Sequence, residues 1–142
     1  MSEASGEAAN TIRCSFSLSG RDFDPDACIR EIGVEGAEVW RQRRPQLAQR
    51  ADLPNVEVSF EVGPEPFESV DDAVRVVLAR VAPATPQILA CVAKHGLKAS
   101  MTAMIKVYTE RPLYELSPES MRVMAELGAT FSIDLIDLRP NE

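Results

Sequence analysis

Three aspartates at alternate positions, Asp22, Asp24 and Asp26, form the most compact group of potential metal ligands in the sequence. Carboxylates at this spacing open the loop of an EF-hand calcium site. That loop also needs glycine at its sixth position and a bidentate glutamate at its twelfth. Ala27 and Gly33 occupy those positions here. We therefore expect no calcium at this segment, and we expect no bound metal or cofactor elsewhere in the chain.

The same segment has the pattern of a helix start. Asp24 can accept hydrogen bonds from the free N–H groups of a first helical turn, and Pro25 suits the first helical position. Ser69 precedes an acidic first turn in the same way, and Ser117 precedes a second proline. We predict that Asp24, Ser69 and Ser117 are the caps of three helices.

Few residues suit nucleophilic or acid–base catalysis. His95 is the only histidine, so one chain cannot form a multi-histidine metal site, and no nucleophile-elbow, phosphate-loop or CxxC motif is present. Cys14, Cys28 and Cys91 lie among apolar neighbours, and we expect them to be buried, reduced thiols. The sequence therefore contains no recognisable catalytic constellation.

One pair of carboxylates leaves a catalytic alternative open. Asp134 and Asp137 flank a point where the alternation of the last predicted strand slips, because Ile136 and Leu138 are both apolar. The slip indicates either a bulge or the end of the strand. Two carboxylates held together in a cleft could perform acid–base chemistry. Solvated acids on an exposed sheet face are the simpler interpretation.

The best candidate for a binding surface is the segment that contains Trp40, Arg41, Arg43 and Arg44. Tryptophan and arginine are frequent anchors at protein interfaces. The arginines begin the one long connection, residues 41–54, and long connections often carry function. We predict an interface with a protein partner here. The alternative is that the tryptophan packs in the core and that the arginines are solvated or pair with nearby acids.

Periodicity indicates the architecture. Apolar and polar residues alternate in four segments and, more weakly, in a fifth, which predicts strands at residues 11–18, 38–42, 55–62, 99–109 and 130–138. Helical periodicity fills the intervals. We predict an α+β fold with a four- to five-stranded, mostly antiparallel sheet and three to four helices packed on one face. Residues 1–10 are expected to form a disordered tail and residues 11–139 a single domain.

Composition restricts the partners and the location. A net charge of −7 disfavours binding to nucleic acid, which depends on neutralising phosphates. No apolar run is expected to reach the roughly 20 residues of a membrane span. The acidic N-terminus does not have the pattern of a signal peptide, and three unpaired cysteines suit a cytoplasm. A homodimer through sheet edges or faces remains an open alternative.

Two terminal segments resemble a known family. Residues 16–29, followed by Ile32-Gly33-Val34, look like the opening of a bacterial domain-of-unknown-function family numbered 4279. Residues 116–121 and 127–135 are similar to its close. The resemblance spans residues 11 to 138 and implies an α+β fold and a bacterial origin. It supplies no functional residue, and the arginine-rich stretch 41–50 matches no clear pattern of the family.

These observations favour a cytoplasmic binding protein over an enzyme. The expected ligand is a protein partner, and an immunity-like role, in which the chain neutralises a toxin, is one concrete form. A domain that senses a small molecule and regulates another protein is the alternative from a different class. An enzyme that uses cleft carboxylates is the third.

Overall fold

The computed structural model describes residues 9–140, and residues 1–8 of the expected tail lie outside the described residues. Its centre is a five-stranded sheet in the order β2-β3-β1-β4-β5. The strands are β1 (Thr11–Gly20), β2 (Glu38–Arg41), β3 (Val56–Glu65), β4 (Lys98–Val107) and β5 (Thr130–Asp137). Three neighbouring pairs are antiparallel and the β4–β5 pair is parallel. The sheet is therefore mixed but mostly antiparallel.

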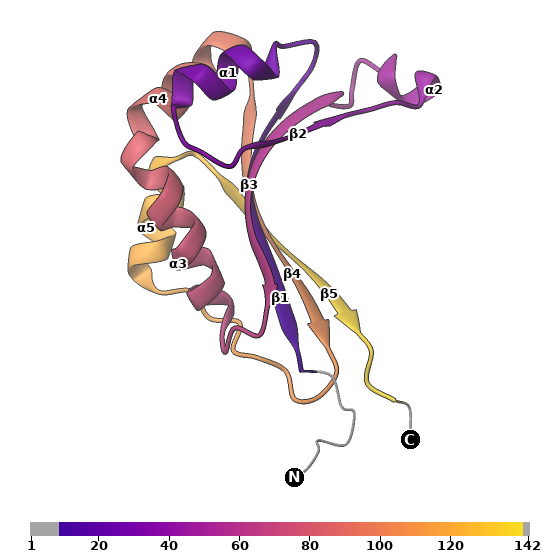
Figure 1. Cartoon of the computed structure of the whole chain (residues 1–142), viewed down its shortest axis with the longest axis vertical. Coiled ribbons are helices and arrows are strands. Elements are labelled where there is room, and N and C mark those ends of the chain that lie inside the picture. The colour runs from indigo at the N-terminus through magenta and orange to yellow at the C-terminus, as the bar shows by residue number, and fades with distance from the viewer. Residues whose placement is uncertain (1–8, 141–142) are drawn as a thin grey trace.

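The helices gather on one side of this sheet (Figure 1). They are α1 (Pro25–Ile32), α3 (Val70–Val81), α4 (Thr85–His95) and α5 (Pro118–Glu126), and a 3₁₀ turn (Ala82–Ala84) joins α3 to α4. The short α2 (Pro45–Ala48) projects on the other side, beyond the end of β2. The predicted α+β fold, with its helices on one face, is confirmed. The long connection after β2, expected to be irregular, contains this additional short helix.

Alternation along the strands separates a helix-covered face from an open face. On β1, Phe16 is fully buried and pairs with Phe60 on β3 and Met101 on β4. The apolar stripe of α3 closes this core with Val70, Ala73, Val74, Val77, Leu78 and Val81. We call the other side the open face. Its central side chains carry hydroxyls: Ser15, Ser17, Ser19, Ser59, Ser100, Thr102, Thr130 and Ser132.

Local hydrogen bonds define where the helices begin. Asp24, Ser69 and Ser117 are the N-cap residues of α1, α3 and α5, and each side chain accepts from backbone N–H groups of the first turn. Gly33 ends α1 with a φ of 75°, a left-handed conformation that glycine adopts without strain. The three caps thus position the helices that cover the sheet.

The last strand decides between the two explanations of its phase slip. Its register with β4 runs without a shift from Thr130 to Asp137, so the slip marks the end of the strand and not a bulge. The two apolar residues that break the alternation, Ile136 and Leu138, do so for different reasons. Ile136 pairs with Lys106 and lies on the open face, while Leu138 follows the strand and donates its N–H to the carbonyl of Val107.

The far end of β3 is shaped by Gly63. The register between β1 and β3 shifts between Ile12 and Cys14, opposite this end of β3. Gly63 has a φ of 87°, and a Cβ there would lie 2.4 Å from the carbonyl oxygen of Ile12. Only glycine permits this close approach. The following Pro64, joined by a cis peptide bond, is thereby placed beside the N-terminal end of β1.

The run from Val70 to His95 is long and apolar enough to cross a membrane by length and composition, with a mean hydropathy of 1.6 in its most apolar window. The expectation that no run approaches this length was therefore too strict. The run is two helices, because Pro83 lies in the turn between α3 and α4. One side of it packs in the core. Core helices of soluble proteins pass the same test, so the run is weak evidence for a membrane span.

Candidate functional site

Trp40 and Arg41 lie on the edge strand β2 but do not share a face. Trp40 pairs with Glu57 on the open face and remains 46% exposed. Arg41 pairs with Val56, so alternation directs it to the other face. Arg43 and Arg44 follow in the turn into α2, and both are exposed. The four predicted residues therefore surround the end of β2 rather than form one flat patch.

Within the part of the chain that the structure describes, the three arginines at this end have no internal partner. Among residues 9–140, no ion pair and no side-chain hydrogen bond involves the guanidinium of Arg41, Arg43 or Arg44. The predicted alternative that Trp40 packs in the core does not describe its position, because nearly half of its side chain is exposed. We call Trp40, Arg41, Arg43 and Arg44 together the β2 tip.

Arg21 holds the segment that follows the β2 tip. Its guanidinium donates to the backbone carbonyls of Ala48 (2.8 Å) and Leu53 (2.6 Å), and also to that of Arg50. A planar guanidinium can donate in several directions at once, so one side chain can bind three backbone carbonyls. The connection after β2 is thus tied to the end of β1 rather than suspended in solvent.

A second contact completes this attachment. Asp22, with a φ of 57°, donates its backbone N–H to Asn55, and the amide of Asn55 donates to the carboxylate of Asp22 at 2.8 Å. Aspartate tolerates this left-handed conformation better than most residues. The first aspartate of the triplet therefore stabilises a loop. Sequence reasoning missed both Arg21 and Asn55, and the only available signal was their position at strand ends beside a long connection.

An open hollow of about 470 Å³ lies beside the attached segment. Its lining comes from the end of β1, the segment before β3 and the turn from α4 to β4. The polar lining residues are Ser19, Arg21, Asp52, His95 and Lys98. The hollow therefore offers both charges to a small polar molecule.

His95 borders this hollow and belongs to a cluster between α1 and α4. Glu31 accepts from the ammonium of Lys94 at 2.8 Å and from the thiol of Cys91 at 3.1 Å. These hydrogen bonds, that from Lys94 foremost, lower the pKa of Glu31 to about 2. The Nε2 atom of His95 lies 3.6 Å from a Glu31 oxygen and has no hydrogen-bond partner in the described part of the chain.

The cysteines are not activated nucleophiles. Burial, followed by the neighbouring Glu31, raises the pKa of Cys91 to about 12. Burial alone raises the pKa of Cys14 to about 12, and it is the main reason that the pKa of Cys28 is also raised. All three are free, buried thiols, and a protonated thiol is a weak nucleophile. The cluster around Glu31 therefore contributes to packing between the two helices.

The structure does not bring the candidate carboxylate pair together. Asp134 pairs with Met104 on the open face, whereas Asp137 pairs with Val107 on the opposite face. Residues three apart on a strand point in opposite directions, so the two carboxyl groups cannot form one site. The hydrogen bonds of Arg139 instead lower the pKa of Asp137 to about 2. No group of three or more metal-ligating side chains occurs within residues 9–140.

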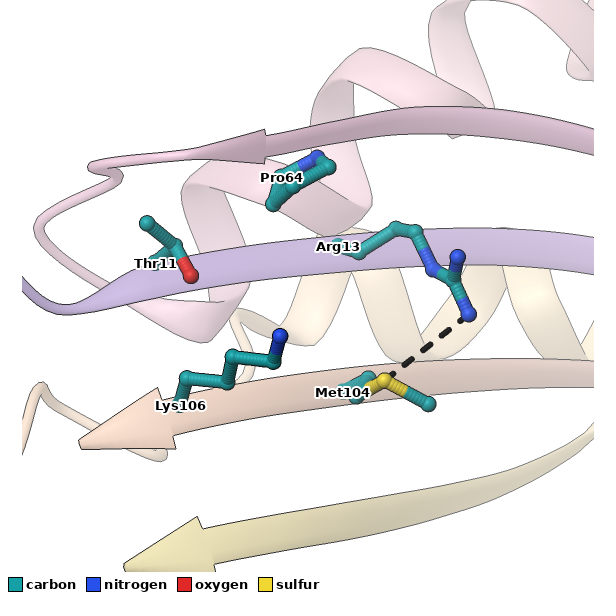
Figure 2. A pocket seen from close by; sticks show the side chains of 5 residues that line it. All are labelled: Thr11, Arg13, Pro64, Met104 and Lys106. Atoms are coloured by element: carbon teal, nitrogen blue, oxygen red, sulfur yellow. Dashed lines mark hydrogen bonds between the residues drawn. The ribbon is translucent and has the colours of Figure 1, made fainter. Parts of the chain in front are cut away.

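A second concave feature lies at the far end of the open face (Figure 2). It has a volume of about 60 Å³ and is lined by Thr11, Arg13, Pro64, Met104 and Lys106. The guanidinium of Arg13 lies 3.7 Å from the sulfur of Met104 and 3.9 Å from Glu61, which partly balances its charge. The feature holds little more than water, and the β2 tip is the stronger candidate site.

The comparisons agree with the resemblance of the terminal segments. A family model described as a domain of unknown function (DUF4279) matches residues 10–138, nearly the whole chain and including the arginine-rich stretch. No curated protein and no solved structure matches the chain. The family description assigns no activity to any residue of the site described above. With this match over almost all of its length, the chain belongs to the DUF4279 family.

Proposed function

We propose that this chain is a non-catalytic interaction protein that binds a protein partner through the β2 tip. The observation that carries the proposal is the exposure, around the end of β2, of Trp40 and of three arginines that have no ion-pair partner within residues 9–140. An aromatic side chain that is 46% exposed leaves apolar area to bury, and unpaired guanidinium groups can form bidentate bonds with carboxylates. The partner therefore presents an acidic surface to the tip.

The attachment by Arg21 supports this function. A binding surface on a free loop loses conformational entropy when the partner binds, which weakens affinity. Here three carbonyl contacts hold the end of α2 and the segment after it to the end of β1, so the connection that follows the tip has less freedom to lose on binding. Inhibition of a toxin in the cytoplasm, an immunity-like role, is one concrete form of this proposal. A toxin gene next to the gene for this chain would favour that form.

The decisive experiment compares two triple variants in affinity capture from native cells, with mass spectrometry as the readout. Arg41→Ala, Arg43→Ala and Arg44→Ala together should abolish capture of the partner, because they remove the unpaired charges. The matched control removes three exposed arginines that already have carboxylate partners: Arg75→Ala, Arg122→Ala and Arg139→Ala. A protein retained by the control and lost by the tip variant supports the proposal. Identical capture by both variants contradicts it.

A small-molecule sensor is the second candidate, and the hollow lined by His95 and Lys98 favours it. A polar ligand in this hollow would contact the segment that Arg21 holds, and it could thereby alter the tip. The test is thermal unfolding across a panel of metabolites, repeated with Lys98→Ala. A ligand that raises the melting temperature of the wild type but not of the variant would support sensing.

A further inference from the structure

The outer edge of β5 is the most unusual part of the sheet. β4 is its sole neighbour within the described sheet, so the backbone groups along its other side have no strand partner. Its apolar side chains remain exposed: Ile133 by 40%, Leu135 by 39% and the adjoining Leu138 by 45%. A long apolar edge of this kind is a template for another strand.

The opposite edge is protected in the ordinary way. β2 has only four residues, and two of them are the charged Glu38 and Arg41. Short, charged edge strands discourage pairing with other chains. β5 has eight residues, and its first acidic side chain is Asp134 at the centre. Protection is therefore weaker at the β5 edge, where Asp134 and Asp137 are the only charged residues among eight.

We propose that two copies of this chain pair through β5, antiparallel, around a two-fold axis at Ile133. The two sheets then form one continuous sheet across both copies. A two-fold axis makes such a contact self-complementary, because each copy supplies the same residues to the other. The proposal is independent of the β2 tip, which lies at the opposite edge of each sheet.

The position of the axis follows from the order of side chains on β5. With the axis at Ile133, Phe131 lies opposite Leu135, and Ile133 lies opposite its own counterpart. These residues share the helix-covered side, so they form a single apolar row across the two copies. On the open side, Ser132 lies opposite Asp134 and can donate a hydrogen bond to it.

Other positions of the axis are less favourable. An axis at Asp134 places two carboxylates directly opposite each other, which is destabilising. An axis at Leu135 places Ile133 opposite Asp137. An axis at Ser132 avoids both conflicts but pairs residues 130–134 in place of residues 130–136. The axis at Ile133 pairs residues 130–136 and places no carboxylate opposite another carboxylate or an apolar side chain.

Sedimentation equilibrium of the full chain is the first test, and it should give twice the monomer mass of 15.6 kDa. Ile133→Lys should convert the dimer to a monomer, because two ammonium groups would meet at the axis. Val39→Lys on the other edge is the matched control, since Val39 is 42% exposed. This control should remain a dimer. A monomeric wild type at every concentration overturns the proposal, as does a dimer that only Val39→Lys dissociates.

Cysteine cross-linking tests the register even where a lysine variant fails to fold. Ile133→Cys should form a disulfide-linked dimer under mild oxidation, because the side chains of directly opposed residues lie about 4.5–5.5 Å apart at Cβ. Ser132→Cys and Asp134→Cys should cross-link efficiently when mixed and poorly alone. The native cysteines are buried and do not interfere. Efficient cross-linking of Asp134→Cys with itself, or none with Ile133→Cys, overturns the register.

Discussion

Phe16 and Ser17 are neighbours on β1, and both are shielded from water, with 0% and 7% exposure. Phe16 is shielded because helices cover it, whereas Ser17 lies on the open face among other small side chains. Low exposure on the two faces therefore has two causes, and only the first removes a large apolar area from water. We expect the helix-covered face to provide stability, while the open side, which carries α2 and Trp40, is free for contacts.

Phe16→Ala is expected to have the largest effect. It should lower the free energy of unfolding by about 3–5 kcal/mol, because a fully buried aromatic side chain leaves a cavity. Ser17→Ala, the matched change on the open face, should alter it by no more than about 1 kcal/mol. Urea unfolding of both variants measures the difference. Equal losses would show that the two faces contribute alike.

Arg21→Ala tests whether polar contacts alone hold α2 on the open side. It should cost about 1.5–3 kcal/mol, as expected for hydrogen bonds from a charged donor. Amide hydrogen exchange should quicken in residues 45–54 and remain slow in β1 and β3. Arg122→Ala is the control, because its ion pairs with Glu119 and Glu126 are exposed on both sides and contribute little to stability. Unchanged exchange in Arg21→Ala would mean that other contacts order the segment.

On the helix-covered side, the carboxylate of Asp71 links two helices through hydrogen bonds. Its carboxylate accepts from the backbone of Ser117 at 2.9 Å and from Arg75 at 2.7 Å, and it thereby joins α3 to the start of α5. Burial alone would raise its pKa, but these bonds outweigh burial and hold the pKa of Asp71 below its ordinary 3.8. Asp71→Asn should cost about 1–2 kcal/mol at neutral pH.

The stability that Asp71 contributes should depend on pH with a definite sign. A carboxyl group with a lowered folded-state pKa stabilises the fold fully above its unfolded pKa. That stabilisation is lost as the pH falls through the lower folded value. The difference in stability between wild type and Asp71→Asn should therefore be constant above the ordinary 3.8 and shrink in stronger acid. A difference that does not depend on pH would exclude the charge as its source.

Glu57→Gln is expected to have the smallest effect, and the effect is stabilising. Burial, with the nearby Glu61, raises the pKa of Glu57 on the open face. The charged form is therefore unfavourable in the folded state at neutral pH, and the variant should gain about 0.5 kcal/mol. The gain should fade as the pH drops through the range in which Glu57 binds a proton. Thermal unfolding at two pH values measures it.

Local features of the fold could be predicted from the sequence, because their causes lie within a few residues. Asp24-Pro25 and Ser117-Pro118 mark helix starts through bonds that span three residues or fewer. The alternation along each strand likewise predicts its two faces. The confirmed α+β fold is the sum of such local signals. The strand order has no comparable signal, because β1 pairs with β4, a strand that lies far from it in the sequence.

The site was harder to predict for the same reason. The hydrogen bonds from Arg21 to Ala48 and Leu53 join residues about thirty positions apart, and no local sequence pattern predicts them. Trp40 and Arg41 look like one cluster in the sequence, yet alternation on β2 directs them to opposite faces. Alternation also places Asp134 and Asp137 on opposite faces of β5, and this could be concluded only once the register with β4 was known.

The central position of β1 also has a consequence for synthesis on the ribosome. Its partner β3 begins at residue 56 and its partner β4 at residue 98, so β1 is synthesised well before both of its neighbours. Until both neighbours are present, the apolar side chains of Ile12, Phe16 and Leu18 have no sheet in which to become buried. Pairings this distant in sequence form slowly. We therefore expect β1 to require protection in the nascent chain until β3 and β4 have emerged from the ribosome.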